Sequence, residues 1–298
     1  MFKINRYSSL DESMWDKFVP NSNNGTIFHL RSFLNYHPKN RFTDHSLIIT
    51  KKDKLFSVFP AAETMINGRL SLISHPGTTV GSFVVPENLS IAESMDLVQC
   101  LIAYAKKNAL YRICITLPPN LYQRRLSNYM DFSFFKHGFQ YLKRDITSIL
   151  FLEKSLKSTL NKFRPSHKRA VKKAIDSGVH IKQSNDFASF YTILEKNLKI
   201  RHGVSPTHTL KELQYIQSLF PDHCNLFAAY LNNKMIAGVV NFIVNEHVVL
   251  AFYISHDESF AEHRAVNLLF YTIFDWAINQ KYKIYDFGTF TVNEEPNM

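Results

Sequence analysis

The sequence predicts an α+β protein of two tandem domains, each a mixed, mainly antiparallel sheet flanked by helices. In residues 225–288, short apolar segments alternate with Asn-rich turns, which is typical of an antiparallel meander. A long apolar segment without Gly or Pro follows and predicts a buried helix, and a short strand pattern comes after it. The same order of elements occurs earlier in the chain, so the layout is expected twice.

The second copy carries the clearer pattern. Its predicted strands are Leu226–Leu231, Met235–Val244, Val248–Ile254 and, after the helix, Ile284–Phe287. The predicted helix, Arg264–Gln280, has a polar stripe that includes Arg264 and Asn267. The last strand ends at Gly288.

The first copy follows the same order with a weaker pattern. Its predicted strands are Phe2–Tyr7, His45–Thr50, Leu55–Thr64, Arg69–Ser74, Tyr111–Leu117, Phe139–Leu142 and Ile146–Leu152. Its predicted helices are Asp11–Val19, Ile27–Tyr36, Ser90–Asn108 and Leu121–Phe135. Ser90 and Glu93 have the spacing of a capping box at the start of a helix. The two helix-to-strand joints, at Tyr111 and Tyr282, are 171 residues apart.

These elements predict an N-terminal domain over residues 1–152 and a C-terminal domain over residues 153–298. The second domain is expected to be incomplete, because the sequence stops ten residues after Gly288, at Met298. By comparison with the first copy it lacks a final helix and two closing strands. A truncated chain and a naturally abbreviated domain both fit this pattern.

Composition narrows the class of protein. The 298 residues carry a net charge of +10, which favours anionic partners, although a generic basic protein has the same charge. Three cysteines without CxxC spacing predict free thiols in a reducing cytoplasm and no metal site. No segment approaches the ~20 apolar residues of a membrane span, and residues 1–13 do not form a signal peptide, so no stable membrane insertion is expected.

A basic segment lies between the copies. Residues 153–182 hold nine Lys or Arg against two acids, and Pro165 and Gly178 mark the ends of a predicted helix. At helical spacing, four cations share one side of this helix, and apolar residues occupy the other. The cations are Lys168, Arg169, Lys172 and Lys173. This side either binds an anion or is a solvated helix face.

The layout resembles the GNAT acyltransferase fold, and its doubling resembles the FemABX peptidyltransferases. The segments that carry the resemblance are HKRAVKKAIDSGV, NLKIRHGV, KMIAGVV and KIYDFG. They fall within residues 160–288, and residues 2–152 follow by element order only. The resemblance implies transfer of an aminoacyl or acyl group onto an amine, classically from aminoacyl-tRNA onto a cell-wall precursor peptide. The long helical arm of some family members is absent from the sequence.

The resemblance also implies where the chemistry takes place. In GNAT folds the acyl donor lies where the fourth and fifth strands part, here between Val248–Ser255 and Ile284–Gly288. The following loop, SHDESFAEHRAVN, has no glycine and contains acids that would repel a pyrophosphate or cap the helix. No cofactor is expected to be tightly bound, and the donor is either aminoacyl-tRNA or acyl-coenzyme A.

The candidate catalytic residues are Tyr253, His256 and Asp286. Tyr253 could donate a hydrogen bond to the leaving group, His256 could accept a proton, and Asp286 could orient the amine. Each has a structural alternative: a strand tyrosine, a surface histidine and a turn-capping carboxylate. The amine could also be deprotonated by the substrate itself, without an essential base.

The candidate substrate-binding residues are Lys168, Arg169, Lys172, Arg201, Arg264, Asn267 and Gly288. Arg201 could hold a phosphate or carboxylate, or stabilise a helix C-terminus. Gly288 would let a substrate approach the backbone closely.

The favoured function is an acyltransferase that acts on an amine of a cell-wall-precursor-like or other small acceptor, with a small-molecule or nucleotide-linked acceptor and charged tRNA as candidate partners. One alternative is a coenzyme A-dependent GNAT N-acetyltransferase. The other is a non-catalytic protein of the same fold that binds RNA or a phosphoglycan; no RNA-recognition motif is evident.

Overall fold

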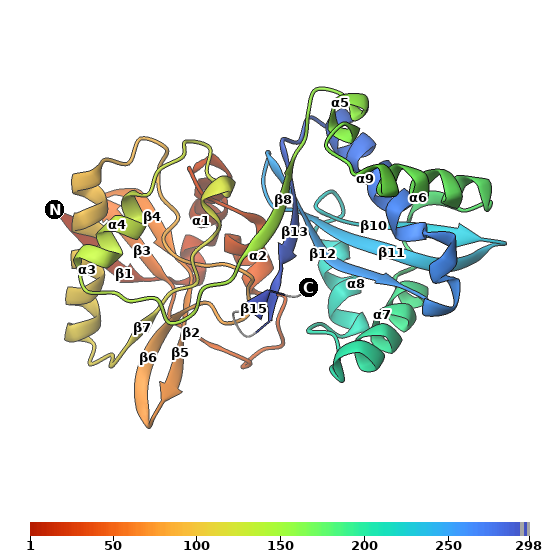
Figure 1. Cartoon of the computed structure of the whole chain (residues 1–298). Helices are drawn as coiled ribbons and strands as arrows, with labels where there is room; N and C mark the ends of the chain where they lie inside the picture. Colours follow the sequence, from red (N-terminus) through yellow and green to blue (C-terminus); the bar gives the residue numbers. More distant parts are fainter. Residues whose placement is uncertain (293–294, 297–298) are drawn as a thin grey trace. The chain divides into compact units, whose positions relative to one another are not determined.

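The computed structural model describes residues 1–292 and 295–296. The chain divides into two compact units, Met1–Leu142 and Lys143–Met298. Both units combine mainly antiparallel sheets with flanking helices (Figure 1), so the predicted α+β class is confirmed.

The strands of the first unit form two small sheets. One has the order β1-β3-β4, from Phe2–Arg6, Leu47–Lys51 and Lys54–Phe59. The other has the order β2-β5-β6-β7, from Thr43–Asp44, Ala61–Ile66, Arg69–Ser74 and Ile113–Cys114. The predicted strand Leu55–Thr64 is divided between the two sheets at Pro60, because proline has no N–H to donate to a ladder.

The helices of the first unit are short apart from one. They are α1 (Glu12–Phe18), α2 (Arg31–Leu34), α3 (Ile91–Lys107) and α4 (Tyr129–Lys136). The Ser90–Glu93 capping box at the start of α3 is confirmed. The predicted helix Leu121–Phe135 begins only at Tyr129, and the predicted strand Phe139–Leu142 does not form.

The second unit is built on one six-stranded sheet with the order β8-β13-β12-β11-β10-β9 (Figure 1). Its strands are β8 (Thr147–Phe151), β9 (His180–Ser184), β10 (Cys224–Leu231), β11 (Lys234–Ile243), β12 (Val248–His256) and β13 (Ile284–Thr289). The β12–β13 pair is parallel and the other pairs are antiparallel. After β13, β14 (Thr291–Val292) and β15 (Glu295–Pro296) pair with each other.

The position of β8 corrects the sequence analysis. Ile146–Leu152 was predicted to close the first domain, whereas β8 pairs with β13 in the second sheet, with Phe151 opposite Ile284. Leu150 and Leu152 pack against the core of the second unit. One edge of β13, in the domain expected to lack two closing strands, is therefore covered by β8, and the units divide after Leu142, not after Leu152. A pairing between such distant residues leaves no local signal in the sequence.

Helices cover both faces of the second sheet (Figure 1). Helices α5 (Leu156–Leu160), α6 (Pro165–Asp176) and α9 (Ala265–Asn279) lie on one side, and α7 (Phe187–His202) and α8 (Leu210–Leu219) lie on the other. Helix α7 approaches β11 closely at Gly238, where an added Cβ would lie 2.5 Å from the ring of Phe190. The absence of a side chain at Gly238 therefore allows α7 to pack this close to the sheet.

None of the helices in the described residues has the length and apolar character needed to cross a membrane.

Candidate functional site

Strands β12 and β13 part soon after they begin. They pair at Val248 with Ile284, Val249 with Tyr285 and Leu250 with Asp286, and β12 then continues to His256 without β13 beside it. On its other edge β12 has a bulge, because Val240 faces Tyr253 while Asn241 faces Ala251, which leaves Phe252 as the extra residue. The structure therefore contains the parting of strands that the sequence analysis expected, beside an irregular stretch of β12.

Gly288 lies where β13 turns away from β12. Its φ is +80°, and an added Cβ would lie 3.6 Å from the carbonyl oxygen of Ala251. The carboxylate of Asp286 is fully buried and accepts a hydrogen bond from the Gly288 N–H at 2.7 Å. Asp286 therefore shapes this turn, as the alternative of a turn-capping carboxylate predicts.

Tyr285, the neighbour of Asp286, points to the opposite face of the sheet, as strand geometry requires. It is fully buried in the core beneath α9, and its hydroxyl donates a 2.6 Å hydrogen bond to Asn241 Oδ1.

The hydroxyl of Tyr253 contacts His208, which lies in the loop between α7 and α8. The hydroxyl accepts a hydrogen bond from the main-chain N–H of His208 at 3.2 Å and lies 2.9 Å from His208 Nδ1. Burial raises the pKa of Tyr253 above its ordinary value. The phenol thus remains a neutral hydrogen-bonding group, and its partner His208, 45 residues away in the chain, was not predicted from the sequence.

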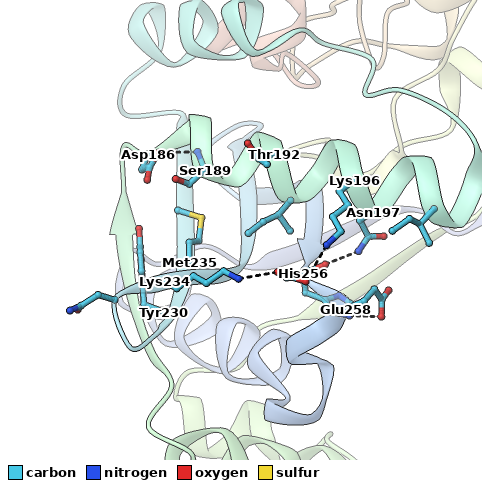
Figure 2. Close-up of a pocket in the computed structure, with 14 residues that line it drawn as sticks. Asp186, Ser189, Thr192, Lys196, Asn197, Tyr230, Lys234, Met235, His256 and Glu258 are labelled. Carbon is cyan, nitrogen blue, oxygen red and sulfur yellow. Dashed lines mark hydrogen bonds and ion pairs between the residues drawn. The ribbon is translucent and has the colours of Figure 1, made fainter.

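A hollow of about 460 Å³, here named the α7 hollow, lies between α7, the start of β11 and the end of β12 (Figure 2). Figure 2 shows polar side chains of α7 on one side and residues of β10 and β11 across from them. The lining residues are Asp186, Ser189, Thr192, Ile193, Lys196, Asn197, Ile200, Tyr230, Asn233, Lys234, Met235, His256, Asp257 and Glu258.

A second hollow of about 270 Å³, here named the α9 hollow, lies at the start of α9. Its lining residues are Arg201, Ile236, His256, Glu258, Phe260, Ala261, Arg264, Ala265, Val266 and Asn267. His256 and Glu258 line both hollows, so the two spaces adjoin at the end of β12.

The start of α9 is suited to an anion. Arg264 occupies the N-cap position with φ +55°, and no side chain caps the first turn of the helix. The main-chain N–H of Asn267 donates to the carbonyl oxygen of Arg264 at 3.0 Å, whereas the N–H groups of Ala265 and Val266 come before the helix can supply an acceptor, and they carry the positive end of the helix dipole. Ala265, Val266 and Asn267 of this turn line the α9 hollow together with Arg264.

Two of the three acids in the loop before α9, Asp257 and Glu258, are paired with basic side chains, whereas Glu262 is exposed and lies 3.8 Å from His263 Nε2. Asp257 accepts hydrogen bonds from Ser259, which hold its pKa below the ordinary range, and lies 3.5 Å from Lys234 Nζ and 3.8 Å from Lys196 Nζ. Arg201 Nε donates to Glu258 at 2.7 Å and is the main cause of the lowered pKa of that carboxyl. With these counter-charges, the loop repels an anion less than its sequence suggested.

The basic side of α6 is exposed and distinct from both hollows. Val171 and Ala174 are buried and pack in the core that includes α9, whereas the side chains of Lys168, Arg169, Lys172 and Lys173 are exposed. Within residues 1–292 and 295–296, none of these four cations has an ion-pair partner. They line neither hollow.

The predicted site residues therefore fall into three groups. His256, Arg201, Arg264 and Asn267 line the α9 hollow. Tyr253, Asp286 and Gly288 lie near the parting of β12 and β13 without lining either hollow. Lys168, Arg169 and Lys172 lie on α6.

Sequence reasoning missed the polar face of α7, which contributes Ser189, Lys196 and Asn197 to the α7 hollow. Their spacing places them on one side of a helix, and this signal was available in the sequence.

Comparisons with known proteins agree with this architecture. Residues 161–295 match the model of the family described as acetyltransferase (GNAT) domain. A search of curated proteins finds no match.

Solved structures are similar over nearly the whole chain. A crystal structure of FemX matches 96% of this chain and 88% of its own, with a TM-score of 0.72 and 14% identity. The structure of L-PGS from Bacillus licheniformis matches 95% of this chain and 76% of its own, with a TM-score of 0.54 and 11% identity. A tandem GNAT protein from the clavulanic acid biosynthesis pathway matches 96% and 89%, with a TM-score of 0.52 and 8% identity. At these identities the similarity establishes the fold.

Proposed function

We propose that the chain transfers an aminoacyl or acyl group onto an amine, because residues 161–295 match the family model described as acetyltransferase (GNAT) domain and the chain has a FemX-like, GNAT-type fold. The observation that carries the proposal is the parting of β12 and β13 after Leu250 and Asp286, beside the bulge at Phe252. Parting strands free backbone N–H groups, and such donors stabilise the oxyanion that forms during acyl transfer.

The donor is proposed to place its phosphate at the α9 hollow. The uncapped first turn of α9 and the side chain of Arg264 supply positive charge there. The acyl group would then extend along β12 toward the strand parting, where the acyl carbonyl meets the backbone donors.

The basic side of α6 favours aminoacyl-tRNA as the donor. Lys168 and Lys172 are one helical turn apart, as are Arg169 and Lys173, so the cations form two short rows with a spacing of about 6 Å. A repeated row of exposed, unpaired cations suits a polyanion better than a single phosphate group.

Acyl-coenzyme A is the second candidate donor. The pairing of Asp257 and Glu258 with basic side chains favours it, because it reduces the repulsion that this loop would otherwise exert on a pyrophosphate.

The α7 hollow is the proposed acceptor site. Its α7 wall runs from Asp186 to Ile200, a distance of about 20 Å at the helical rise, which leaves room for an elongated molecule. Hydroxyl, amide and charged groups line it together with Ile193, Met235 and Tyr230. These walls suit a small or nucleotide-linked acceptor that carries an amine, such as a cell-wall precursor, and His256 lies between this acceptor and the donor.

The test is to incubate the protein separately with charged tRNA and with acyl-coenzyme A, together with a panel of amine acceptors, and to follow loss of the acyl group. Acceptor-dependent loss from one donor is expected. If neither donor loses its acyl group above the spontaneous rate, while RNA or a phosphorylated glycan still binds, the chain is a non-catalytic binding protein of this fold.

A further inference from the structure

We infer that Glu258 and Arg201 are positioning residues that fix the orientation and tautomer of His256, so that His256 accepts the proton of the attacking amine at Nδ1. The inference rests on the proposed acyl transfer and assigns roles within the same site.

The two oxygens of Glu258 face different partners. Oε1 accepts a 2.7 Å hydrogen bond from Arg201 Nε, and Nη2 of the same guanidinium also contacts this oxygen. Oε2 lies 3.5 Å from His256 Nε2. The carboxylate thus lies between the guanidinium and the imidazole.

The three residues come from three separate elements. Arg201 is in the last turn of α7, His256 ends β12, and Glu258 begins the short helix Glu258–His263. A further contact fixes the end of the strand, because Asn197 Nδ2 donates to the main-chain oxygen of His256 at 2.9 Å. The end of α7 therefore holds His256 twice, through its main chain by Asn197 and toward its ring by Arg201 and Glu258.

The chemistry of the carboxylate determines the tautomer. The hydrogen bond from Arg201 keeps the pKa of Glu258 below its ordinary value, so the carboxyl group is ionised and only accepts hydrogen bonds. The neutral imidazole beside it is stabilised with its proton on Nε2, which leaves the lone pair on Nδ1. His256 lines both hollows and its side chain is 23% exposed, so the inference assigns Nδ1 as the atom that meets a substrate at their junction.

The proposed step balances without a further reactant. The amine nitrogen forms a bond to the donor's carbonyl carbon, and Nδ1 takes one N–H proton from it. The carbonyl carbon then releases the tRNA ribose oxygen or the coenzyme A sulfur, which takes that proton from the imidazolium. Glu258 stabilises the imidazolium between these two transfers, as the carboxylate of a catalytic triad does.

This arrangement gives Arg201 a role different from both expectations from the sequence, anion binding and stabilisation of a helix C-terminus. Both Nε and Nη2 of its guanidinium are directed at Glu258. Arg201 thus acts on the reaction through Glu258 and His256.

The kinetic test compares Glu258→Gln with Glu262→Gln, a matched change of a more exposed acid in the same loop. Glu258→Gln is expected to lower kcat by about 10- to 100-fold with little change in KM, whereas Glu262→Gln leaves both unchanged. Because Glu258 acts through His256, adding Glu258→Gln to His256→Ala should cause no further loss. If Glu258→Gln lowered kcat in the His256→Ala background by as much as it does in the wild-type protein, the inference would be overturned.

A second readout does not require activity. In the wild-type protein at neutral pH, ¹⁵N NMR of the side chain of His256, assigned with His256→Ala, should show the Nε2–H tautomer. Glu258→Gln and Arg201→Met should shift the signals toward the other tautomer, and Arg201→Lys should retain more of the wild-type pattern. An unchanged tautomer in Glu258→Gln would overturn the inference. If the wild type transfers no acyl group from either donor, the proposed function fails, and the NMR comparison still decides whether the pair positions His256.

Discussion

Leu250 of β12 and Asp286 of β13 form the last residue pair before these parallel strands separate. Beyond this pair, the backbone turns at Gly288, where the N–H donates to the carboxylate of Asp286 at 2.7 Å. The proposed acyl site depends on this separation, because continued pairing would use the N–H groups of β12 within the sheet.

Replacement of Gly288 should therefore affect both stability and activity. The φ of +80° is strained for any L-residue, so Gly288→Ala should lower the free energy of unfolding by about 1–2 kcal/mol. An added Cβ would make only ordinary contacts with Ala251 and Leu250, so the alanine variant should fold. Gly288→Val places more bulk toward β12 and should reduce acyl transfer further. Denaturant unfolding and the donor assay measure the two effects.

Gly68→Ala is the matched control for backbone strain. Gly68 has φ +73° in a turn of the first unit, and an added Cβ would meet nothing within 4 Å. The Gly68→Ala variant should lose about as much stability as Gly288→Ala and keep full acyl-transfer activity. Full activity in a folded Gly288→Val protein would place the acyl site elsewhere.

Charge reversal on α6 should weaken RNA binding without unfolding the protein. Changing Lys168, Arg169, Lys172 and Lys173 to Glu alters only exposed side chains of α6. If all four contact phosphates, affinity for tRNA should fall at least tenfold at low salt. The slope of log affinity against log salt should also decrease by about 3. Filter binding across a salt series would measure both.

The control for this change reverses four exposed lysines of the first unit, Lys52, Lys54, Lys106 and Lys107, which alters the net charge equally. Its salt slope should stay close to the wild-type value. Equal weakening in both variants would mean that net charge alone attracts RNA and that the side of α6 is a solvated surface.

The Tyr285 hydroxyl should contribute measurably to stability. Tyr285 is fully buried and donates to Asn241 Oδ1 at 2.6 Å, and Asn241 Nδ2 in turn donates to Asn225 at 3.0 Å. Tyr285→Phe leaves a buried acceptor without this donor and should cost about 1–3 kcal/mol. Tyr282→Phe, a half-buried tyrosine in the same region, should cost less than about 0.5 kcal/mol. Equal values in denaturant unfolding would contradict this role.

Acidification should destabilise the first unit through His29. Burial lowers the pKa of His29 from 6.5 to about 4, so its neutral form is the folded one. Between pH 6.5 and 4 the unfolded chain binds a proton that the folded chain does not, and stability is lost as the pH falls. For His29 alone the loss from pH 7 to pH 5 should be about 2 kcal/mol. His75, with a pKa lowered to about 4 by burial, adds to it in the same direction.

Unfolding free energies measured at both pH values would test this prediction. His29→Gln removes the titrating group, so the variant should show a pH dependence smaller by about that amount, whatever its absolute stability. A pH dependence equal to that of the wild type would mean that other groups are responsible.

The sequence by itself determined the local elements and their order. The apolar segments and Asn-rich turns of residues 225–254 predicted the meander β10–β12, the apolar run after them predicted α9, and Pro165 and Gly178 predicted the ends of α6. These features depend on periodicity and turn chemistry, which act between near neighbours in the chain. The expected parting of β12 and β13 followed from the resemblance to GNAT folds.

Tertiary structure alone decided which distant residues meet. It placed β8 beside β13, although the two are separated by most of the second unit, and so moved a strand from one predicted domain to the other. It also paired Arg201 with Glu258 across 57 residues and brought His208 to Tyr253 across 45. Such contacts form when separate elements bury their apolar faces together, and the energy of that packing depends on the whole core and not on any local pattern.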